Sequence, residues 1–352
     1  MARSLRIRDT LIDDDGPAYV IAELGSNGQA DTELTRRFIA AAAEAGASAV
    51  KLQKRDNATL YTRAALAAPY VHANSFGATY GEHRAALEYS TPQLIELRDY
   101  AHECGVDFGC TAFDPTSAKL LASIGVDFLK VASACITDTE LLACIGSFGI
   151  PVVASTGTAT MHDVFIAAAA LTRAGAPFAL LQCSAVYPLH DPRLLNLRVI
   201  ETYRRSFPHI VTGLSSHYPY GQDALLAYML GGRLFEKHFT LDRAMRGADH
   251  AFSLDPDGLA GLMADLTIAR LMLGSPEKTR LPEEQPAIAK MGHSLYAARD
   301  LAAGETLTRR DIAIKSPGGF IPPSRLDDML GRKLTTALAE DEPVPEMRWY
   351  EG

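Results

Sequence analysis

The sequence predicts a (β/α)8 barrel followed by a small, mostly β domain. Short apolar segments alternate with longer helical segments from residue 19 to residue 273, and the character of the chain changes after that point. The apolar segments lack clean period-two alternation, as expected when both faces of a strand are covered. Eight such units favour a closed barrel of roughly 250 residues over a doubly wound open sheet.

The eight strands are predicted from short apolar runs that are bounded by polar or glycine-containing turns. They are residues 19–23, 49–53, 107–110, 128–131, 151–154, 178–183, 210–214 and 234–239. The predicted helices are residues 32–46, 91–103, 115–124, 161–174, 197–207, 223–230 and 256–273. Asp31 suits the N-cap of the first helix and Gly46 its end, because a carboxylate accepts hydrogen bonds from free amides and glycine tolerates the turn that stops a helix.

A long segment, residues 54–90, interrupts the alternation after the second strand. It is rich in Tyr, His, Asn and Arg. Loops of this length inside a compact domain usually serve as functional lids or as partner contacts. The sequence leaves both roles open.

The predicted domains are a barrel at residues 1–273, a linker at residues 274–290 and a C-terminal domain at residues 291–352. The linker is charged and contains several prolines, with little periodicity. The C-terminal domain reads as short strands and turns, and a core of roughly 60 residues is marginal by itself. We therefore expect it to dock on the barrel or on the barrel of a partner chain.

Composition narrows the class of protein. A net charge of -8 argues against nucleic acid or an anionic membrane as the main partner. The five cysteines are odd in number and show no CxxC spacing, which favours reduced thiols over a disulfide framework or a zinc ribbon. The N-terminus lacks an apolar signal region, and no run approaches the roughly 18 apolar residues of a membrane span. We expect a cytoplasmic protein.

Two histidines stand where buried parallel strands meet their loops. His217 follows the strand at residues 210–214, and His238 lies at the end of the strand at residues 234–239, beside Glu236. A single His is more often a hydrogen-bonded core residue, but two at matching strand ends favour a pair of ligands. Because active sites of these barrels lie at the carboxyl ends of the strands, the pair predicts a half-built divalent metal site with room for substrate oxygens.

Further polar side chains gather at the same predicted end of the barrel. They are Glu23, Lys51, Gln53, Thr111, Lys130, Ser133, Ser155, Ser184, Tyr187 and Ser215. Lysines and hydroxyls that converge near glycine amides suit a small, strongly anionic substrate. Several of these residues have a structural alternative: the lysines could pair with barrel carboxylates, and Ser155 could cap a helix. Asp249, in the loop after the last predicted strand, could likewise be a surface residue.

A family resemblance strengthens this interpretation. The chain contains, in this order, the motifs IAELGSNGQ, AAAEAGASAVKLQ, STGTAT, QCSAVYP, GLSSH, EKHFTLDR and DHAFSL. Together they resemble the sialic acid (N-acetylneuraminate) synthase family, and AARDLAAGETLTRRDIAIKSPGG resembles the antifreeze-like (SAF) domain that these synthases carry. The resemblance covers about residues 18–340.

The resemblance implies a carbon–carbon bond-forming transferase of carbohydrate biosynthesis. Such an enzyme condenses phosphoenolpyruvate with the open-chain aldehyde of an N-acylhexosamine, here expected to be N-acetylmannosamine. The products are a nine-carbon 2-ulosonic acid and phosphate. It also implies a divalent ion, manganese or magnesium, and a domain-swapped homodimer in which the small domain of one chain covers the other's barrel.

The resemblance also assigns roles to individual residues. His217 and His238 match the metal ligands, and Glu23 matches a carboxylate that handles the proton of water. Catalytic roles are expected for Glu23, Lys51 and Glu236. The positions that match phosphoenolpyruvate binding are Lys51, Lys130, Ser133, Ser155 and Ser215, and those that face the sugar are Gln53, Tyr187, Glu236 and Asp249.

Four positions depart from the family pattern. Gly28 stands where a histidine is usual, Ala185 replaces an asparagine and Ser216 replaces an aspartate. In the C-terminal domain Ser316 replaces an arginine that reaches the N-acyl group of the sugar. The sugar end of the site is therefore less well preserved than the phosphoenolpyruvate end, which leaves the acceptor open.

Three other functions remain. A synthase of a related acid, legionaminic, pseudaminic or deaminated, would use a different acceptor. A His-x-His pair on the first strand would favour a metal-dependent barrel hydrolase, and this strand has no such pair. A non-catalytic sugar-phosphate-binding protein would not need the metal ligands and the carboxylates together.

Overall fold

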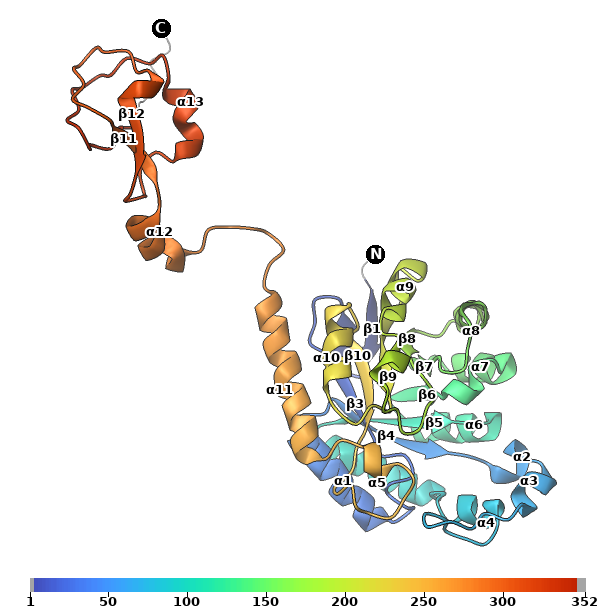
Figure 1. The fold of residues 1–352 in the computed structure, drawn as a ribbon. Coiled ribbons are helices and arrows are strands. Elements are labelled where there is room, and N and C mark those ends of the chain that lie inside the picture. The colour runs from blue at the N-terminus through green and yellow to red at the C-terminus, as the bar shows by residue number, and fades with distance from the viewer. Residues whose placement is uncertain (1–2, 347–352) are drawn as a thin grey trace. The chain divides into compact units, whose positions relative to one another are not determined.

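The computed structural model describes residues 3–346. Eight parallel strands form a closed barrel in the order β10-β3-β4-β5-β6-β7-β8-β9, so that the last strand pairs with the first (Figure 1). The strands are β3 (Tyr19–Glu23), β4 (Ala49–Lys54), β5 (Asp107–Ala112), β6 (Phe128–Val131), β7 (Val152–Ser155), β8 (Phe178–Gln182), β9 (Val211–Ser216) and β10 (Leu234–His238). The predicted barrel is confirmed.

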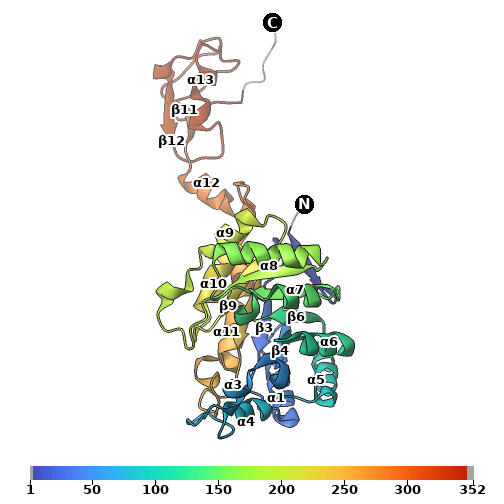
Figure 2. The same cartoon turned by 90° about the vertical axis from the view of Figure 1, so that its right-hand side faces the viewer.

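Helices surround the strands, as both views show (Figures 1 and 2). Those that follow the barrel strands are α1 (Thr32–Glu44), α5 (Thr91–Glu103), α6 (Pro115–Ile124), α7 (Thr139–Gly146), α8 (Met161–Arg173), α9 (Val199–Ser206), α10 (Gln222–Met229) and α11 (Pro256–Leu273). Side-chain caps define where several begin. Asp31 accepts from the Leu34 amide at the start of α1, as the sequence predicts.

Among the helices that follow the barrel strands, α7 was not predicted. Helix α7 has only eight residues, and the strand at residues 128–131 was expected to lead directly to the next one. Its signal was present in Asp138, which caps the Leu141 amide, and in the buried Leu141, Leu142 and Ile145. Short helices carry few turns of periodicity, so a single cap is easily overlooked.

A hairpin closes the N-terminal end of the barrel. Strands β1 (Ser4–Ile7) and β2 (Thr10–Asp13) pair in antiparallel fashion, and neither strand was expected from the sequence. Leu5, Ile7 and Ile12 are buried in one cluster with the inward-facing residues of the barrel strands. The hairpin therefore seals this end of the barrel, and ligands must enter from the other.

The long segment after β4 contains short helices rather than an irregular loop. They are α2 (Asn57–Leu60), α3 (Arg63–Ala67) and α4 (Tyr80–Ala85). In both views these helices lie at the end of the barrel opposite the β1–β2 hairpin (Figures 1 and 2). A bridge between Pro69 and Thr79 closes the intervening turn. The segment thus forms an ordered wall beside the carboxyl ends of the strands.

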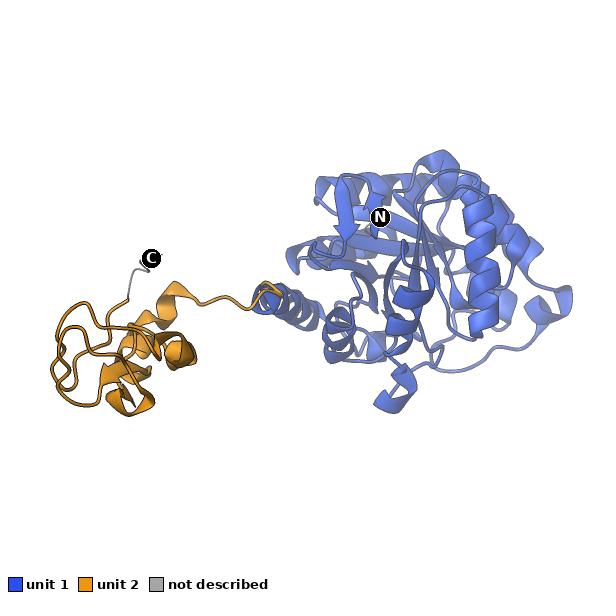
Figure 3. Cartoon of the chain, turned by 90° about the horizontal axis from the view of Figure 1, so that it is seen from above, with its two compact units in different colours: residues 1–274 blue, residues 275–352 orange. Residues whose placement is uncertain are grey.

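The described chain separates into two compact units, residues 1–274 and 275–352 (Figure 3). The second unit holds α12 (Gln285–Met291), β11 (Ser294–Ala297), β12 (Ile312–Lys315) and α13 (Leu326–Met329). It buries a cluster of its own that includes Leu295, Ile312 and Leu334. In neither unit does a described helix have the length and apolar character needed to cross a membrane.

Candidate active site

A cavity of ≈ 280 Å³ opens where the barrel strands end. All the predicted site residues except Ser184 line it, namely Glu23, Lys51, Gln53, Thr111, Lys130, Ser133, Ser155, Tyr187, Ser215, His217, Glu236, His238 and Asp249. They come together because each of the eight barrel strands, or the loop after it, contributes at the same end. Adjacent parallel strands in one register make these ends neighbours.

The innermost contact is a buried ion pair between β3 and β4. Lys51 Nζ lies 2.5 Å from Glu23 Oε2 and donates to Thr111 Oγ1 at 2.6 Å. Both charged side chains are only 2% exposed. Burial raises the pKa of the Glu23 carboxyl although Lys51 opposes this effect. Burial works against the Lys51 cation, but Glu23 and Glu236 outweigh it and raise its pKa, so the lysine stays protonated.

A second lysine and carboxylate face each other more loosely. Lys130 Nζ donates to the Val131 carbonyl at 2.8 Å and lies 3.9 Å from Glu236 Oε2. Burial lowers the pKa of Lys130. Burial opposes ionisation of Glu236, but Lys130 and Lys51 prevail and lower its pKa. Glu236 Oε2 has no hydrogen-bond partner, although its residue is buried. A bound donor or cation would satisfy this oxygen.

Hydroxyls and a glycine amide form the adjoining wall. Ser133 Oγ accepts from the Gly157 amide at 3.0 Å, and Ser215 Oγ donates to Glu236 Oε1 at 3.3 Å. Ser155 Oγ is buried without a partner. A Cβ on Gly157 would lie 2.7 Å from Ser133 Oγ, so glycine allows this close approach. Free donors beside two lysines suit an anionic ligand.

The two histidines lie side by side, with their ring centroids 5.3 Å apart. His217 Nδ1 is 3.3 Å from the Ser184 carbonyl. Burial and the neighbouring His238 lower the pKa of His217 to about 3, so its imidazole is neutral. His238 Nδ1 has no hydrogen-bond partner and lies 3.8 Å from Asp249 Oδ2. Neutral imidazoles with unshared electron pairs are the form in which histidine binds metal.

This donor set fits an open divalent ion site. Across residues 3–346, no three His, Cys, Asp or Glu side chains are arranged to hold an ion together. Because their rings lie side by side and His238 Nδ1 has no partner, His217 and His238 could supply two ligands, with the remaining positions left to substrate or water. Such a partly built set is suited to substrate binding rather than to a closed structural site.

Ser184 is the predicted residue that the cavity leaves out. Its hydroxyl donates to the Leu194 carbonyl at 2.5 Å, and its own carbonyl is the group that faces His217. The nearby Tyr187 ring lies 3.8 Å from the His217 ring, measured between centroids. Substrate binding by the Ser184 side chain stays a prediction.

Local contacts explain two of the four departures from the family pattern, Gly28 and Ser216. A Cβ on Gly28 would lie 2.2 Å from Tyr89 Oη and 2.4 Å from Thr35 Oγ1, so these side chains fill the space of a larger residue. Ser216 Oγ accepts from the Tyr218 amide at 3.1 Å. The structure gives no such reason for Ala185, and Ser316 belongs to the second unit.

The cavity also has a wall whose residues were not assigned to the site from the sequence. It consists of Arg55, which follows β4, and of Tyr70, Phe76, His83, Arg84 and Leu87 from the segment at residues 54–90. Arg55 could have been found, because Lys51, Gln53 and Arg55 alternate along one strand and its extension. The others carried no signal beyond the length and aromatic content of the segment.

Comparison with known proteins identifies the class. Residues 38–278 match the NeuB family and residues 292–346 match the SAF domain. The chain belongs to the NeuB family, the sialic acid synthases, and carries their antifreeze-like domain. It is an enzyme of the nonulosonic acid synthase class.

Individual relatives are similar over nearly the whole chain. The N-acetylneuraminate-9-phosphate synthase of Mus musculus is 36% identical and covers 94% of this chain and 92% of its own length. The N,N'-diacetyllegionaminic acid synthase of Legionella pneumophila is 32% identical, with 91% of each chain covered. A crystal structure of N-acetylneuraminic acid synthetase from Leptospira borgpetersenii superposes with a TM-score of 0.72 at 28% identity, over 82% of this chain and 96% of that one.

Proposed function

We propose that this protein condenses phosphoenolpyruvate with the open-chain aldehyde of an N-acylhexosamine, with N-acetylmannosamine as the parent sugar. The products are a nine-carbon 2-ulosonic acid and inorganic phosphate. The observation that carries the proposal is the meeting of two buried lysines, unpartnered hydroxyl and carboxylate oxygens and two neighbouring imidazoles in one cavity. The lysines and hydroxyls suit the phosphate and carboxylate of phosphoenolpyruvate, and the imidazoles suit a divalent ion that would face the aldehyde oxygen.

The lysines would hold phosphoenolpyruvate. Lys51 is cationic at neutral pH because Glu23 and Glu236 raise its pKa, and Lys130 lies across the same cavity. The Ser155 hydroxyl, which is buried and has no partner, would donate to a phosphate or carboxylate oxygen. These charge-assisted bonds orient C3 of phosphoenolpyruvate toward the aldehyde carbon, and the shielded site strengthens them.

The reaction requires one new carbon–carbon bond and the loss of phosphate. C3 attacks the aldehyde carbon, water adds to the cationic C2, and phosphate leaves the resulting tetrahedral centre. A divalent ion, manganese or magnesium, held by His217 and His238 would polarise the aldehyde oxygen as a Lewis acid. Glu23 would accept the proton of the attacking water, since burial raises the pKa of its carboxyl toward a useful range.

The test is phosphate release from phosphoenolpyruvate with manganese present, over a panel of N-acetylmannosamine, mannose, the 6-phosphates of these two sugars, and 2,4-diacetamido sugars. We expect release that requires one acceptor and that stops on addition of a chelator or in His238→Ala. His162→Ala is the matched control, because His162 is exposed on α8. Silence with every acceptor, phosphorylated sugars included, would refute the proposed synthase and leave the binding-protein alternative.

A different acceptor is the second candidate. The diacetyllegionaminic acid synthase of Legionella pneumophila is 32% identical, and Ser316 departs from the arginine that the resemblance expects at the sugar. Release with a 2,4-diacetamido sugar but not with N-acetylmannosamine would select the related acid.

A homodimer is also part of the proposal. The second unit has its own small core, built around residues such as Leu295 and Leu334, and a core of this size gains stability from docking. Two copies would exchange this unit so that it covers the partner's barrel. A monomer by light scattering with full activity would contradict this arrangement. We propose a cytoplasmic location, supported by five free thiols.

A further inference from the structure

A buried ion pair lies on the outer side of β10, away from the cavity. Glu236 and His238 line the cavity, so Lys237, which alternates with them along the strand, faces the surrounding helices. The Lys237 side chain is 2% exposed, and that of its partner Asp223, the second residue of α10, is fully buried. Apolar residues often stabilise a fold as well as a buried ion pair does. This pair therefore indicates a role beyond stability.

Three acceptor atoms surround the Lys237 ammonium. Its Nζ lies 2.9 Å from Asp223 Oδ2 and 3.1 Å from Asp223 Oδ1, and it donates to the Tyr218 carbonyl at 2.6 Å. Asp223 Oδ1 also accepts from the Ala224 amide at 2.8 Å, which fixes the carboxylate at the first turn of α10. Because an ammonium carries three donors, this set leaves none for a substrate. Lys237 is thus suited to hold the chain in place.

The sheet holds the two candidate metal ligands to different degrees. His238 is the last residue of β10 and pairs with Glu23 of β3. Strand β9 ends at Ser216, so His217 stands one position beyond it. The backbone carbonyl of His217 accepts a long hydrogen bond, 3.4 Å, from the Leu189 amide. The position of the His217 ring therefore depends on the loop that follows.

This loop is fixed at Tyr218, the residue after His217. The Tyr218 amide donates to Ser216 Oγ at 3.1 Å, and its carbonyl accepts from Lys237 Nζ at 2.6 Å. Ser216 and Lys237 are themselves partners in the paired strands β9 and β10. Lys237 therefore links the two ligands, since its backbone continues into His238 and its side chain holds the residue after His217.

We infer that Lys237 and Asp223 are positioning residues for the candidate metal site. Lys237 keeps the His217 ring beside the His238 ring, with the centroids 5.3 Å apart. Asp223 orients the lysine and neutralises its charge, because an uncompensated ammonium behind the two imidazoles would repel a divalent ion. The inference rests on the proposed function, since it concerns the ion that the proposed reaction uses.

The experiment measures the affinity for manganese itself, from the electron paramagnetic resonance signal of the free ion, with and without phosphoenolpyruvate. For Lys237→Met we expect an affinity about 10-fold or more below that of the native chain, as is typical when a group behind a metal ligand is removed. The Tyr218 carbonyl loses its donor, and His217 loses its fixed place. The urea midpoint of unfolding should fall as well, because Asp223 stays buried without its cation.

The double variant Lys237→Met/Asp223→Val separates positioning from stability. It replaces the ion pair by apolar side chains, so the urea midpoint should regain part of the loss. The Tyr218 carbonyl still lacks its donor, so the affinity for manganese should stay about 10-fold low. Recovery of the affinity together with the stability would overturn the inference and make the pair purely structural.

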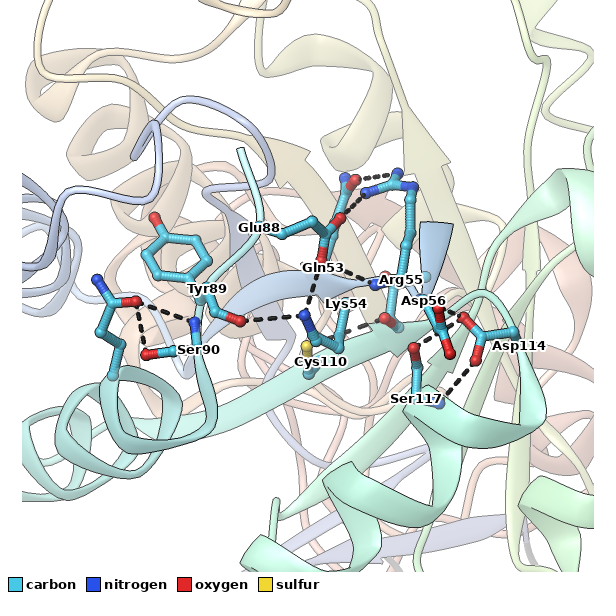
Figure 4. Close-up of polar contacts among 12 residues, drawn as sticks. Gln53, Lys54, Arg55, Asp56, Glu88, Tyr89, Ser90, Cys110, Asp114 and Ser117 are labelled. Atoms are coloured by element: carbon cyan, nitrogen blue, oxygen red, sulfur yellow. Dashed lines mark hydrogen bonds and ion pairs between the residues drawn. The ribbon is translucent and has the colours of Figure 1, made fainter. Parts of the chain in front are cut away.

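Lys54→Met is the matched control. Lys54 ends β4, and its Nζ also contacts a carboxylate and a carbonyl (Figure 4). These are Glu88 Oε2 at 3.1 Å and the Tyr89 carbonyl at 3.0 Å. Because β3 separates β4 from β10 in the barrel, this variant should lower the urea midpoint and leave the affinity for manganese unchanged. An equal loss of affinity in Lys54→Met and Lys237→Met would contradict the inference, since general loosening would explain both.

Turnover distinguishes this inference from the proposed synthase. Phosphate release by Lys237→Met should be low at limiting manganese and should rise toward the native rate as manganese is added. Native affinity for manganese in Lys237→Met would reject the positioning role while the synthase proposal stands. No release by the native chain with any acceptor, together with manganese binding that depends on Lys237, would refute the synthase and support the positioning role. A native chain that binds no manganese would overturn both.

Discussion

The two ends of the barrel treat buried polar groups differently. At the N-terminal end, Tyr19 Oη donates to Asp107 Oδ2 at 2.8 Å, and Asp14 accepts from Arg3 at 2.9 Å and from Arg204 at 2.7 Å. At the carboxyl end, Ser155 Oγ, Glu236 Oε2 and His238 Nδ1 are buried without hydrogen-bond partners.

The difference distinguishes polar groups that stabilise the fold from polar groups that are available to a ligand. Carboxylates at the hairpin end are matched by partners within the chain, as groups that stabilise a fold require. Polar atoms at the cavity end are desolvated but incomplete, and each carries a free-energy cost until a ligand binds. The unpartnered carboxylate and imidazole atoms of the described residues thus gather at the cavity end, although Arg3 Nε beside the hairpin and Thr212 Oγ1 early in β9 also lack partners.

The largest expected effect lies at the innermost pair. Lys51→Met should leave Glu23 buried without its cation and lower the free energy of unfolding by about 3–5 kcal/mol. Turnover should fall about 10²- to 10³-fold, because a donor to the substrate anion is lost. Urea unfolding and phosphate release measure the two effects.

The double variant Lys51→Met/Glu23→Gln sharpens this result. It removes both charges, so much of the lost stability should return while activity stays low. Recovery of activity together with stability would show that Lys51 is structural, and that the cavity end resembles the hairpin end after all.

Glu23→Gln alone should act mainly on the chemistry. The amide retains the size of the side chain and an oxygen that can accept from Gln53, whose Nε2 lies 2.5 Å from Glu23 Oε1. Turnover should fall about 10²-fold or more, with binding of phosphoenolpyruvate preserved. Rapid-quench or steady-state phosphate release measures turnover, and unchanged turnover would remove Glu23 from the proton-transfer role.

Gly28→His tests how tightly the loop after β3 is packed. Its Cβ would meet Tyr89 Oη at 2.2 Å and Thr35 Oγ1 at 2.4 Å, so we expect a loss of about 1–3 kcal/mol in unfolding free energy. Adding Tyr89→Phe removes one clashing atom and should restore part of it. Full native stability in Gly28→His by urea unfolding would mean that the loop can rearrange.

The smallest effect is expected at the hairpin end, in Asp14→Asn. The carboxyl is partly exposed; burial disfavours its charge, but Arg204 and Arg3 prevail and lower its pKa from 3.8. Because the folded pKa is the lower one, this stabilisation is present above pH 3.8 and is lost as pH falls through the folded value. We expect a loss below about 1 kcal/mol near neutral pH that shrinks in acid, with turnover unchanged.

Much of the barrel followed from local sequence. The strands at residues 19–23 and 128–131 and the helices at residues 91–103 and 115–124 have the predicted bounds, because strand ends and caps carry local signals. The β1–β2 hairpin and α7 were missed. The hairpin is stabilised by its contact with the barrel interior, through Leu5, Ile7 and Ile12. No local sequence pattern indicates such a contact.

The candidate site was predictable where strands end. A parallel barrel brings the carboxyl ends of its strands together, so residues such as Glu23, Lys51 and His238 could be grouped from their places in the sequence alone. Arg84, Tyr70 and His83 could not be grouped with them. They belong to an insertion whose path depends on contacts with distant loops, including the bonds that the loop after β10 donates to the carbonyls of this insertion.

The sequence by itself determined the alternation of strands and helices, the gathering of charged residues at strand ends and the family. These follow from periodicity, capping and motif order, which are properties of neighbouring residues. The tertiary structure decided that Ser184 turns away from the cavity, that Gly28 has no room for a side chain and that two arginines line the cavity. Each of these depends on atoms far apart in the chain, and only packing sets their distances.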